Sequence, residues 1–136
     1  MTIPITAHGT TLREACADAA TQVLALTVDP AVIEERDVRE VRAHGPTAEA
    51  LLCHWINECL YVHELEAFAC RRVELAVFDA EPRSGGEPLR LHSFLHGEEM
   101  DPERHRLRAR LKGVAPRAVV IELVPAGYEI RLTLET

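Results

Sequence analysis

Two stretches of the chain place apolar residues at helical spacing. Over residues 10–26, apolar side chains recur every three or four positions, which predicts an amphipathic helix whose N-cap is Thr10 or Thr11. A second apolar stripe runs through residues 47–63 and is about 140° wide, with Cys59 in its middle. A stripe of that width faces a core, so both stretches are predicted to be helices that pack on the rest of the protein.

The other patterned stretches alternate apolar and polar residues, as β-strands do. In the stretch 67–80 the alternation slips near Cys70, which predicts a β-bulge, and the Gly- and Pro-rich residues 81–88 predict a hairpin loop. Most strands follow the second helix. The sequence therefore predicts an α+β fold with one domain over residues 1–136, in which two amphipathic helices pack on a mainly antiparallel sheet. The expected strands are residues 2–8, 36–44, 67–80, 89–97, 104–114, 117–125 and 128–135.

Composition narrows the classes of protein to which the chain can belong. Its 136 residues are 47% hydrophobic but only 4% aromatic, so aliphatic side chains supply most of the core. The net charge of −7 disfavours direct binding of nucleic acid unless cations gather in a local patch. The four cysteines form no C-x-x-C pair, and neither a secretory signal nor an apolar run of about 20 residues occurs. We therefore expect a reduced, cytoplasmic protein with no membrane partner.

No pattern in the chain is typical of an enzyme. Glycine-rich phosphate-binding motifs are absent, and no serine or cysteine sits in a nucleophile elbow. We therefore predict no catalytic residues and a protein that is not an enzyme.

The second predicted helix also carries side chains that often bind metals. His54 and His63 are nine residues apart and point to roughly opposite sides of the helix, so they cannot share one ion. Each pair that does share a face supplies two ligands, whereas a structural zinc site needs four. We interpret the stretch as a core helix; a metal site would need ligands from elsewhere, such as His92 or His96, which fit a half-exposed strand edge. The side chains in question are Cys53, His54, Glu58, Cys59, His63 and Glu64.

Cations are concentrated in residues 104–114. If this stretch is a regular strand, five cations project from one face and His105 projects from the other. That face is either solvated and neutralised by neighbouring acids, or a patch that docks an acidic partner surface or RNA phosphate. Our hypothesis is that Arg106, Arg108 and Arg110 contribute to partner binding. The five cations are Arg104, Arg106, Arg108, Arg110 and Lys112.

Several stretches, in order along nearly the whole chain, resemble the archease family. AEALLCHWINECLYVHE at 48–64 is the nearest match, similar to the family's helix in which Leu-Leu precedes Trp-Leu-Asn-Glu-Leu-Leu-Tyr. ITAHGTTLREACADAATQVLALTVD at 5–29 resembles the opening strand and the Ala-Ala helix. HGEEMDPERHRLRARLKGV at 96–114 resembles the family's Gly-Glu, its later His and the Lys-Ala-Val that follow. YEIRLTLET at 128–136 resembles the terminal strand.

The resemblance implies a small cytoplasmic α+β accessory factor. Its partner is the GTP-dependent RNA ligase that joins 2′,3′-cyclic phosphate or 3′-phosphate ends to 5′-hydroxyls in tRNA splicing and RNA repair. Such a factor promotes guanylylation and turnover of the ligase and meets RNA only indirectly. By resemblance, Lys112, Glu135 and His105 are the candidate functional residues, and Glu135 is the candidate ligand of a divalent cation. In a regular strand His105 and Lys112 would face opposite ways, so a bend, for which Gly113 is a candidate, would be needed to bring them together.

The chain departs from the family at positions that matter for this role. Thr2 stands where the family's first strand has an Asp, and Pro116-Arg117 replaces a Tyr-His pair. Glu135 takes the place of the terminal Asp and keeps a carboxylate. A hard cation needs several oxygen ligands, so either the metal site is weakened, or another acid substitutes, or the function has diverged. We expect no firmly bound cofactor. The alternative function is an interaction module of the archease fold that has lost the metal site and the activating role.

Overall fold

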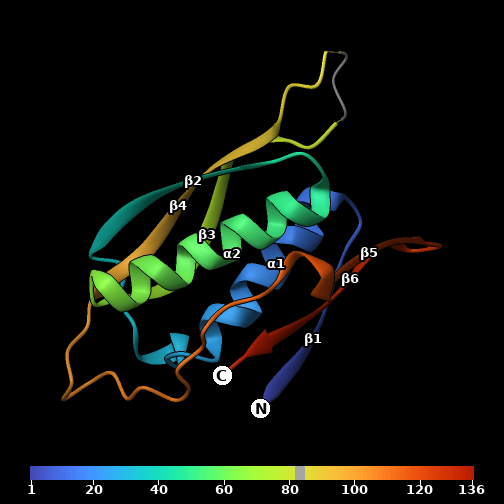
Figure 1. Cartoon of the computed structure of the whole chain (residues 1–136). Helices are drawn as coiled ribbons and strands as arrows, with labels where there is room; N and C mark the ends of the chain where they lie inside the picture. Colours follow the sequence, from blue (N-terminus) through green and yellow to red (C-terminus); the bar gives the residue numbers. More distant parts are fainter. Residues whose placement is uncertain (82–84) are drawn as a thin grey trace.

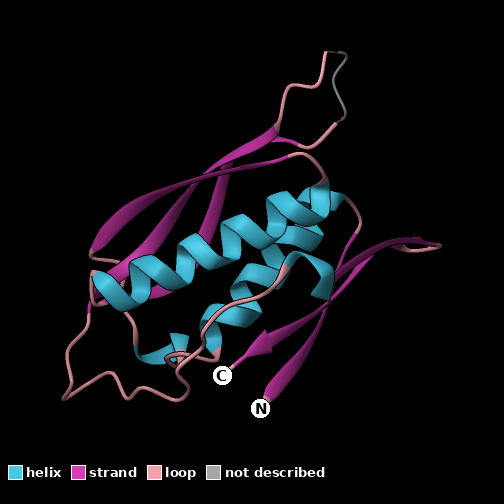
Figure 2. Cartoon of the chain, in the orientation of Figure 1, coloured by secondary structure: helices cyan, strands magenta, loops and turns pink. Residues whose placement is uncertain are grey.

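The computed structural model describes residues 1–81 and 85–136 (Figures 1 and 2). The centre of the hairpin loop predicted over 81–88 lies outside the described residues. The helices and strands lie close to the predicted ranges, except that residues 104–114 form no strand. In chain order they are β1 (Thr2–Gly9), α1 (Leu12–Ala25), β2 (Asp37–Gly45), α2 (Ala48–Leu65), β3 (Phe68–Asp79), β4 (Leu89–Glu99), β5 (Val119–Val124) and β6 (Gly127–Glu135).

The strands form two antiparallel sheets rather than one. One sheet has the order β1-β6-β5 and the other the order β2-β4-β3. Helix α1 packs on β1 and β6 of the first sheet and on β3 of the second, and α2 packs on β5 and on all three strands of the second. Figure 1 shows the two helices between the sheets. The predicted α+β class, with two helices packed on antiparallel strands, is confirmed.

Helix α2 is the central core helix, as its apolar stripe predicts. Its N-cap is Thr47, whose hydroxyl accepts a hydrogen bond from the Ala50 amide. Trp55 is completely buried, and its indole N–H donates to the Ser93 hydroxyl (2.8 Å), which donates to the Val41 carbonyl (2.9 Å). This polar chain connects α2 to β4 and β2. Among the described residues, no helix is both long enough and apolar enough to cross a lipid bilayer.

The candidate metal ligands of α2 are separated, as the helical geometry predicts. Cys59 is buried in the core, and burial raises the pKa of its thiol well above the ordinary value. The Nδ1 of His54 accepts a hydrogen bond from the His44 amide (3.1 Å), whereas the Nδ1 of His63 lies 2.9 Å from the Phe68 carbonyl oxygen. The two histidines therefore contact different segments of the chain.

The sheet β2-β4-β3 contains the predicted β-bulge in β3 and the predicted half-exposed histidines of β4. The register of β3 on β4 shifts between Cys70 and Arg72, which confirms the bulge, and a second shift follows further along β3. His92 and His96 lie on one half-exposed face of β4, and the Nε2 of His96 is 2.7 Å from a Glu74 carboxylate oxygen. These two histidines therefore belong to the outer surface of the sheet.

The strand predicted over residues 104–114 is wrong. This stretch belongs to a connection between β4 of one sheet and β5 of the other and is not paired with a strand along its length; we call residues 100–115 the crossover segment (orange in Figure 1). Only Gly113 forms an isolated bridge, with Glu135. Elsewhere its backbone bonds are scattered, such as the Arg108 amide donating to the Thr27 carbonyl (2.7 Å). The alternation of polar and apolar residues in this stretch reflects which side chains are exposed to solvent. It does not reflect pairing with a neighbouring strand.

Candidate functional site

Two of the predicted site residues meet where the crossover segment passes the last strand. The Lys112 amide donates to the Glu135 carbonyl (2.7 Å), and the Glu135 amide donates to the Gly113 carbonyl (2.9 Å). Gly113 has φ +136°, a conformation that favours glycine, so the chain bends here as expected, although the bend does not bring His105 to Lys112. Both side chains are exposed beside a cavity of about 300 Å³, which is lined by Asn57, Lys112, Gly113, Val114, Ala115 and Glu135. We call this place the Lys112–Glu135 site.

Asn57 of α2 holds this part of the crossover segment in place. Its Nδ2 donates to the Val114 carbonyl (2.9 Å), and its Oδ1 accepts from the Val114 amide (2.9 Å). The side chain thus makes the two backbone hydrogen bonds that a neighbouring β-strand would otherwise make. A Cβ at Gly113 would lie 2.6 Å from Oδ1, so only glycine allows this approach. The sequence reasoning missed Asn57. Asn57 lies about 160° around the helix from Cys59, well outside the predicted apolar stripe, so the pattern held no signal for it.

Replacing Asn57 by alanine is expected to lower the free energy of unfolding by about 2 kcal/mol, because the Val114 amide loses its partner and the Val114 carbonyl keeps only the Cys53 thiol as a weak donor (3.1 Å). Urea denaturation monitored by circular dichroism measures the change. Glu58→Ala removes only a surface contact with His54 on the same helix and should cost a few tenths of a kcal/mol. Equal losses in the two variants would contradict the role given to Asn57.

The side chains at this site do not fit a firmly held divalent cation. Glu135 is the one carboxylate among the residues that line the cavity, and the cationic Lys112 lines it too. In the register of β1 on β6, Thr2 lies opposite Glu135, so the expected second carboxylate is replaced by a hydroxyl. Across the described ranges, no group of three or more His, Cys, Asp or Glu side chains could hold a metal ion. Hard cations need several oxygen ligands, which this set lacks.

His105 lies at a different place, near the start of the crossover segment. It is buried, and its Nδ1 accepts a hydrogen bond from the Asp101 amide (2.8 Å). Its Nε2 is 3.1 Å from a carboxylate oxygen of Glu98, so in this tautomer Nε2–H donates to Glu98. The structure therefore does not bring His105 to Lys112 and Glu135. Its contacts instead hold the turn that follows β4.

The buried carboxylate of Glu98 is the centre of an ionic cluster that the sequence reasoning did not single out. Burial alone would raise the pKa of its carboxyl. Hydrogen bonds from the Arg104 guanidinium, from the Glu34 amide (2.6 Å) and from His105 outweigh burial and lower the pKa to about 2. This carboxylate therefore joins the crossover segment to the end of β4 and to the loop before β2.

The cations of the crossover segment divide into two groups. Arg104 pairs with Glu98 and Arg108 with Asp29 (3.5 Å), so these two are neutralised by neighbouring acids. Over the part of the chain that the structure describes, Arg106, Arg110 and Lys112 form no ion pair, although all three are exposed. Lys112 is also the only lysine in the sequence. The hypothesis that this segment binds a partner remains a prediction and rests on the unpaired cations.

Comparison with known proteins finds a matching family model, related sequences and solved structures of similar fold. A model of the Archease protein family (MTH1598/TM1083) matches residues 3–135. The protein archease of Pyrococcus abyssi is 29% identical over 125 residues, which cover 92% of this chain and 84% of that protein. The solution structure of a Methanobacterium thermoautotrophicum protein aligns with a TM-score of 0.73 and 21% identity, over 99% of this chain and 91% of that one. A Thermotoga maritima archease, described as a possible chaperone, aligns with a TM-score of 0.56 and 13% identity, over 100% and 90%.

Proposed function

This chain belongs to the archease family, and on that premise we propose that it activates a GTP-dependent RNA ligase in tRNA splicing or RNA repair. The observation that carries the proposal is the Lys112–Glu135 site, where an ammonium and a carboxylate far apart in the sequence share one exposed cavity. The protein acts by contact with the ligase, in the cytoplasm, and meets RNA through the ligase. It carries out no reaction of its own.

We propose that the two side chains act directly on the ligase during guanylylation. The Lys112 ammonium carries three donors and a full charge, which suits a phosphate oxygen of the nucleotide or an acid of the ligase. Glu135 accepts hydrogen bonds and orients a donor on the ligase. Asn57 and the bend at Gly113 keep both groups in place before the partner arrives, which lowers the entropic cost of forming the complex. Because the site offers one carboxylate, its action does not depend on a resident divalent cation.

The test adds the protein to the GTP-dependent RNA ligase of the same organism and measures guanylylation and multiple-turnover joining of RNA ends. Wild type is expected to accelerate both. Glu135→Gln should lower the maximal acceleration about tenfold or more, because a charge-assisted hydrogen bond is lost. Glu103→Gln makes the same chemical change at an exposed position of the crossover segment and should leave the acceleration unchanged.

Lys112 allows a chemical version of this experiment. Since it is the only lysine, reagents for amines reach Lys112 and the N-terminal amine alone. Acetylation, which removes the charge, should abolish the acceleration, whereas reductive dimethylation, which keeps it, should preserve activity. Lys112→Arg protein treated in the same way reports the effect of the N-terminal amine. Acceleration that survives acetylation of wild type would contradict the role of Lys112.

A second function is favoured by the substitutions around the site. Thr2 faces Glu135 where the family has an Asp, and Pro116-Arg117 replaces Tyr-His where a short turn (Pro116–Ala118) follows the cavity. An interaction module that binds the ligase without activating it would keep the fold and lose these groups. Binding of wild type to the ligase with no acceleration of guanylylation would favour this function over the first.

A further inference from the structure

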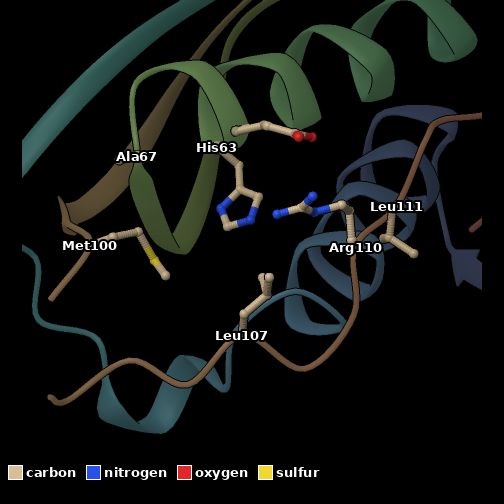
Figure 3. Close-up of a pocket in the computed structure, with 7 residues that line it drawn as sticks. His63, Ala67, Met100, Leu107, Arg110 and Leu111 are labelled. Atoms are coloured by element: carbon tan, nitrogen blue, oxygen red, sulfur yellow. The ribbon is translucent and has the colours of Figure 1, made fainter. Parts of the chain in front are cut away.

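A second cavity lies between the C-terminal end of α2 and the crossover segment (Figure 3). Its volume is about 210 Å³. Met100, Leu107 and Leu111 form an aliphatic wall, and Leu107 is 44% exposed although its side chain is apolar. We call it the docking cavity. Covering an exposed aliphatic surface of this kind with another apolar group lowers the free energy.

Two nitrogen-bearing side chains converge on the docking cavity. In Figure 3 the imidazole of His63 and the guanidinium of Arg110 point toward one another from α2 and from the crossover segment. The Nδ1 of His63 donates to the Phe68 carbonyl (2.9 Å), which leaves Nε2 without a partner among the described residues. Arg110 forms no ion pair in the same residues. Both groups are therefore available to a ligand.

No carboxylate in the described part of the chain forms an ion pair with Arg110. Glu64 also lines the docking cavity, but its carboxylate is not within ion-pairing distance of the guanidinium. Arg106, four residues earlier, is a further exposed cation with no ion pair in the described part of the chain. The protein as a whole has a net charge of −7, so these two unpaired cations form a local basic surface. Such a surface favours an acidic ligand.

The size and walls of the cavity indicate what kind of acidic occupant fits. Sites for small-molecule ligands usually enclose about 300–1,000 Å³, and this cavity is smaller. RNA bases stack best on Phe, Tyr and Trp side chains, and none of these three lines the cavity. An aliphatic side chain of a protein fits both the volume and the walls.

We propose that the docking cavity binds an acidic segment of a partner protein. An aliphatic side chain of that segment packs against Met100, Leu107 and Leu111, and a neighbouring carboxylate forms a bidentate pair with Arg110 that His63 Nε2 flanks. The identity of the partner rests on the proposed function, which makes it the GTP-dependent RNA ligase. The docking cavity supplies affinity, whereas the Lys112–Glu135 site supplies activation.

The experiment measures two quantities for each variant: the Kd for the ligase of the same organism by isothermal titration, and the concentration that gives half-maximal guanylylation. Arg110→Glu is expected to raise the Kd about tenfold to a hundredfold, with an equal rise in the half-maximal concentration and an unchanged maximum. Leu107→Asp should act in the same direction through the aliphatic wall. Circular dichroism verifies that each variant is folded.

Arg42→Glu is the matched control. It makes the same change in charge on β2, where the Arg42 side chain is 72% exposed and does not line the docking cavity. Its Kd should stay within about twofold of wild type. If Arg42→Glu and Arg110→Glu weaken binding equally, general electrostatic attraction explains the result and the docking proposal is overturned.

Other outcomes separate this proposal from the proposed function. If Arg110→Glu weakens binding although wild type does not accelerate guanylylation, docking is supported and the activating function fails. If wild type accelerates guanylylation and Arg110→Glu changes neither quantity, docking fails and the activating function is supported. Binding of a single-stranded RNA oligonucleotide that is lost in Arg110→Glu would assign the cavity to RNA and overturn the proposal.

Discussion

Replacing Trp55 by alanine is expected to lower the free energy of unfolding by about 4 kcal/mol. Trp55 is completely buried where α2 packs on β4, so the truncation leaves a cavity that the neighbouring strands cannot fill. The indole N–H bond to Ser93 is lost as well. Folded domains are stable by only about 5–15 kcal/mol, so this single change removes a large share of the total. Urea denaturation at 25 °C and neutral pH measures the loss.

Two further variants separate packing from hydrogen bonding at this position. Trp55→Phe keeps most of the buried apolar area and removes the N–H, while the Ser93 hydroxyl still donates to the Val41 carbonyl. It should therefore cost about 1–2 kcal/mol. Tyr61→Ala truncates an aromatic side chain of the same helix that is 62% exposed and should change stability by no more than about 0.5 kcal/mol. A loss below about 1 kcal/mol for Trp55→Ala would show that α2 is not the core helix.

The helices were predictable because their apolar stripes are set by local geometry alone. The N-cap of α1 is Thr11, one of the two predicted residues, and the stripe of α2 faces the core as expected. The strand predicted over 104–114 failed because a β-strand requires a neighbour, and partners distant in the sequence leave no trace in a local pattern. The division into two sheets was hidden for the same reason.

The candidate site was predictable in part. The resemblance selected Lys112 and Glu135, and the structure places them together through backbone bonds around Gly113. His105 was grouped with them because all three come from matched family segments, but order along the chain says nothing about distance in space. Asn57 and Glu98 were missed because each acts through contacts made only after folding.

Glu98→Gln is expected to lower the free energy of unfolding by about 3 kcal/mol at pH 7, since the folded-state pKa of about 2 lies well below the ordinary 4.5 and each pKa unit is about 1.4 kcal/mol. Glu98 is 6% exposed and His105 2%, so solvent screens their contact only weakly, whereas it screens the contact with the 37% exposed Arg104 side chain more. The variant keeps the acceptor for the Glu34 amide but loses the charge. Glu99→Gln, at the exposed neighbouring position, should cost less than about 0.5 kcal/mol.

The pH dependence of this difference identifies its cause. A carboxyl group whose pKa is lower in the folded protein binds fewer protons there than in the unfolded chain, so its stabilisation is fully present above about pH 4.5 and declines as the pH falls toward 2. The difference between wild type and Glu98→Gln should therefore be constant from pH 7 to pH 5 and shrink below that range in urea titrations. A difference that stays constant down to pH 3 would mean that packing, and not the ionised carboxylate, connects the crossover segment to β4. In that case acid would leave the positions of His105 and of the segment that leads to Arg110 and Lys112 unchanged.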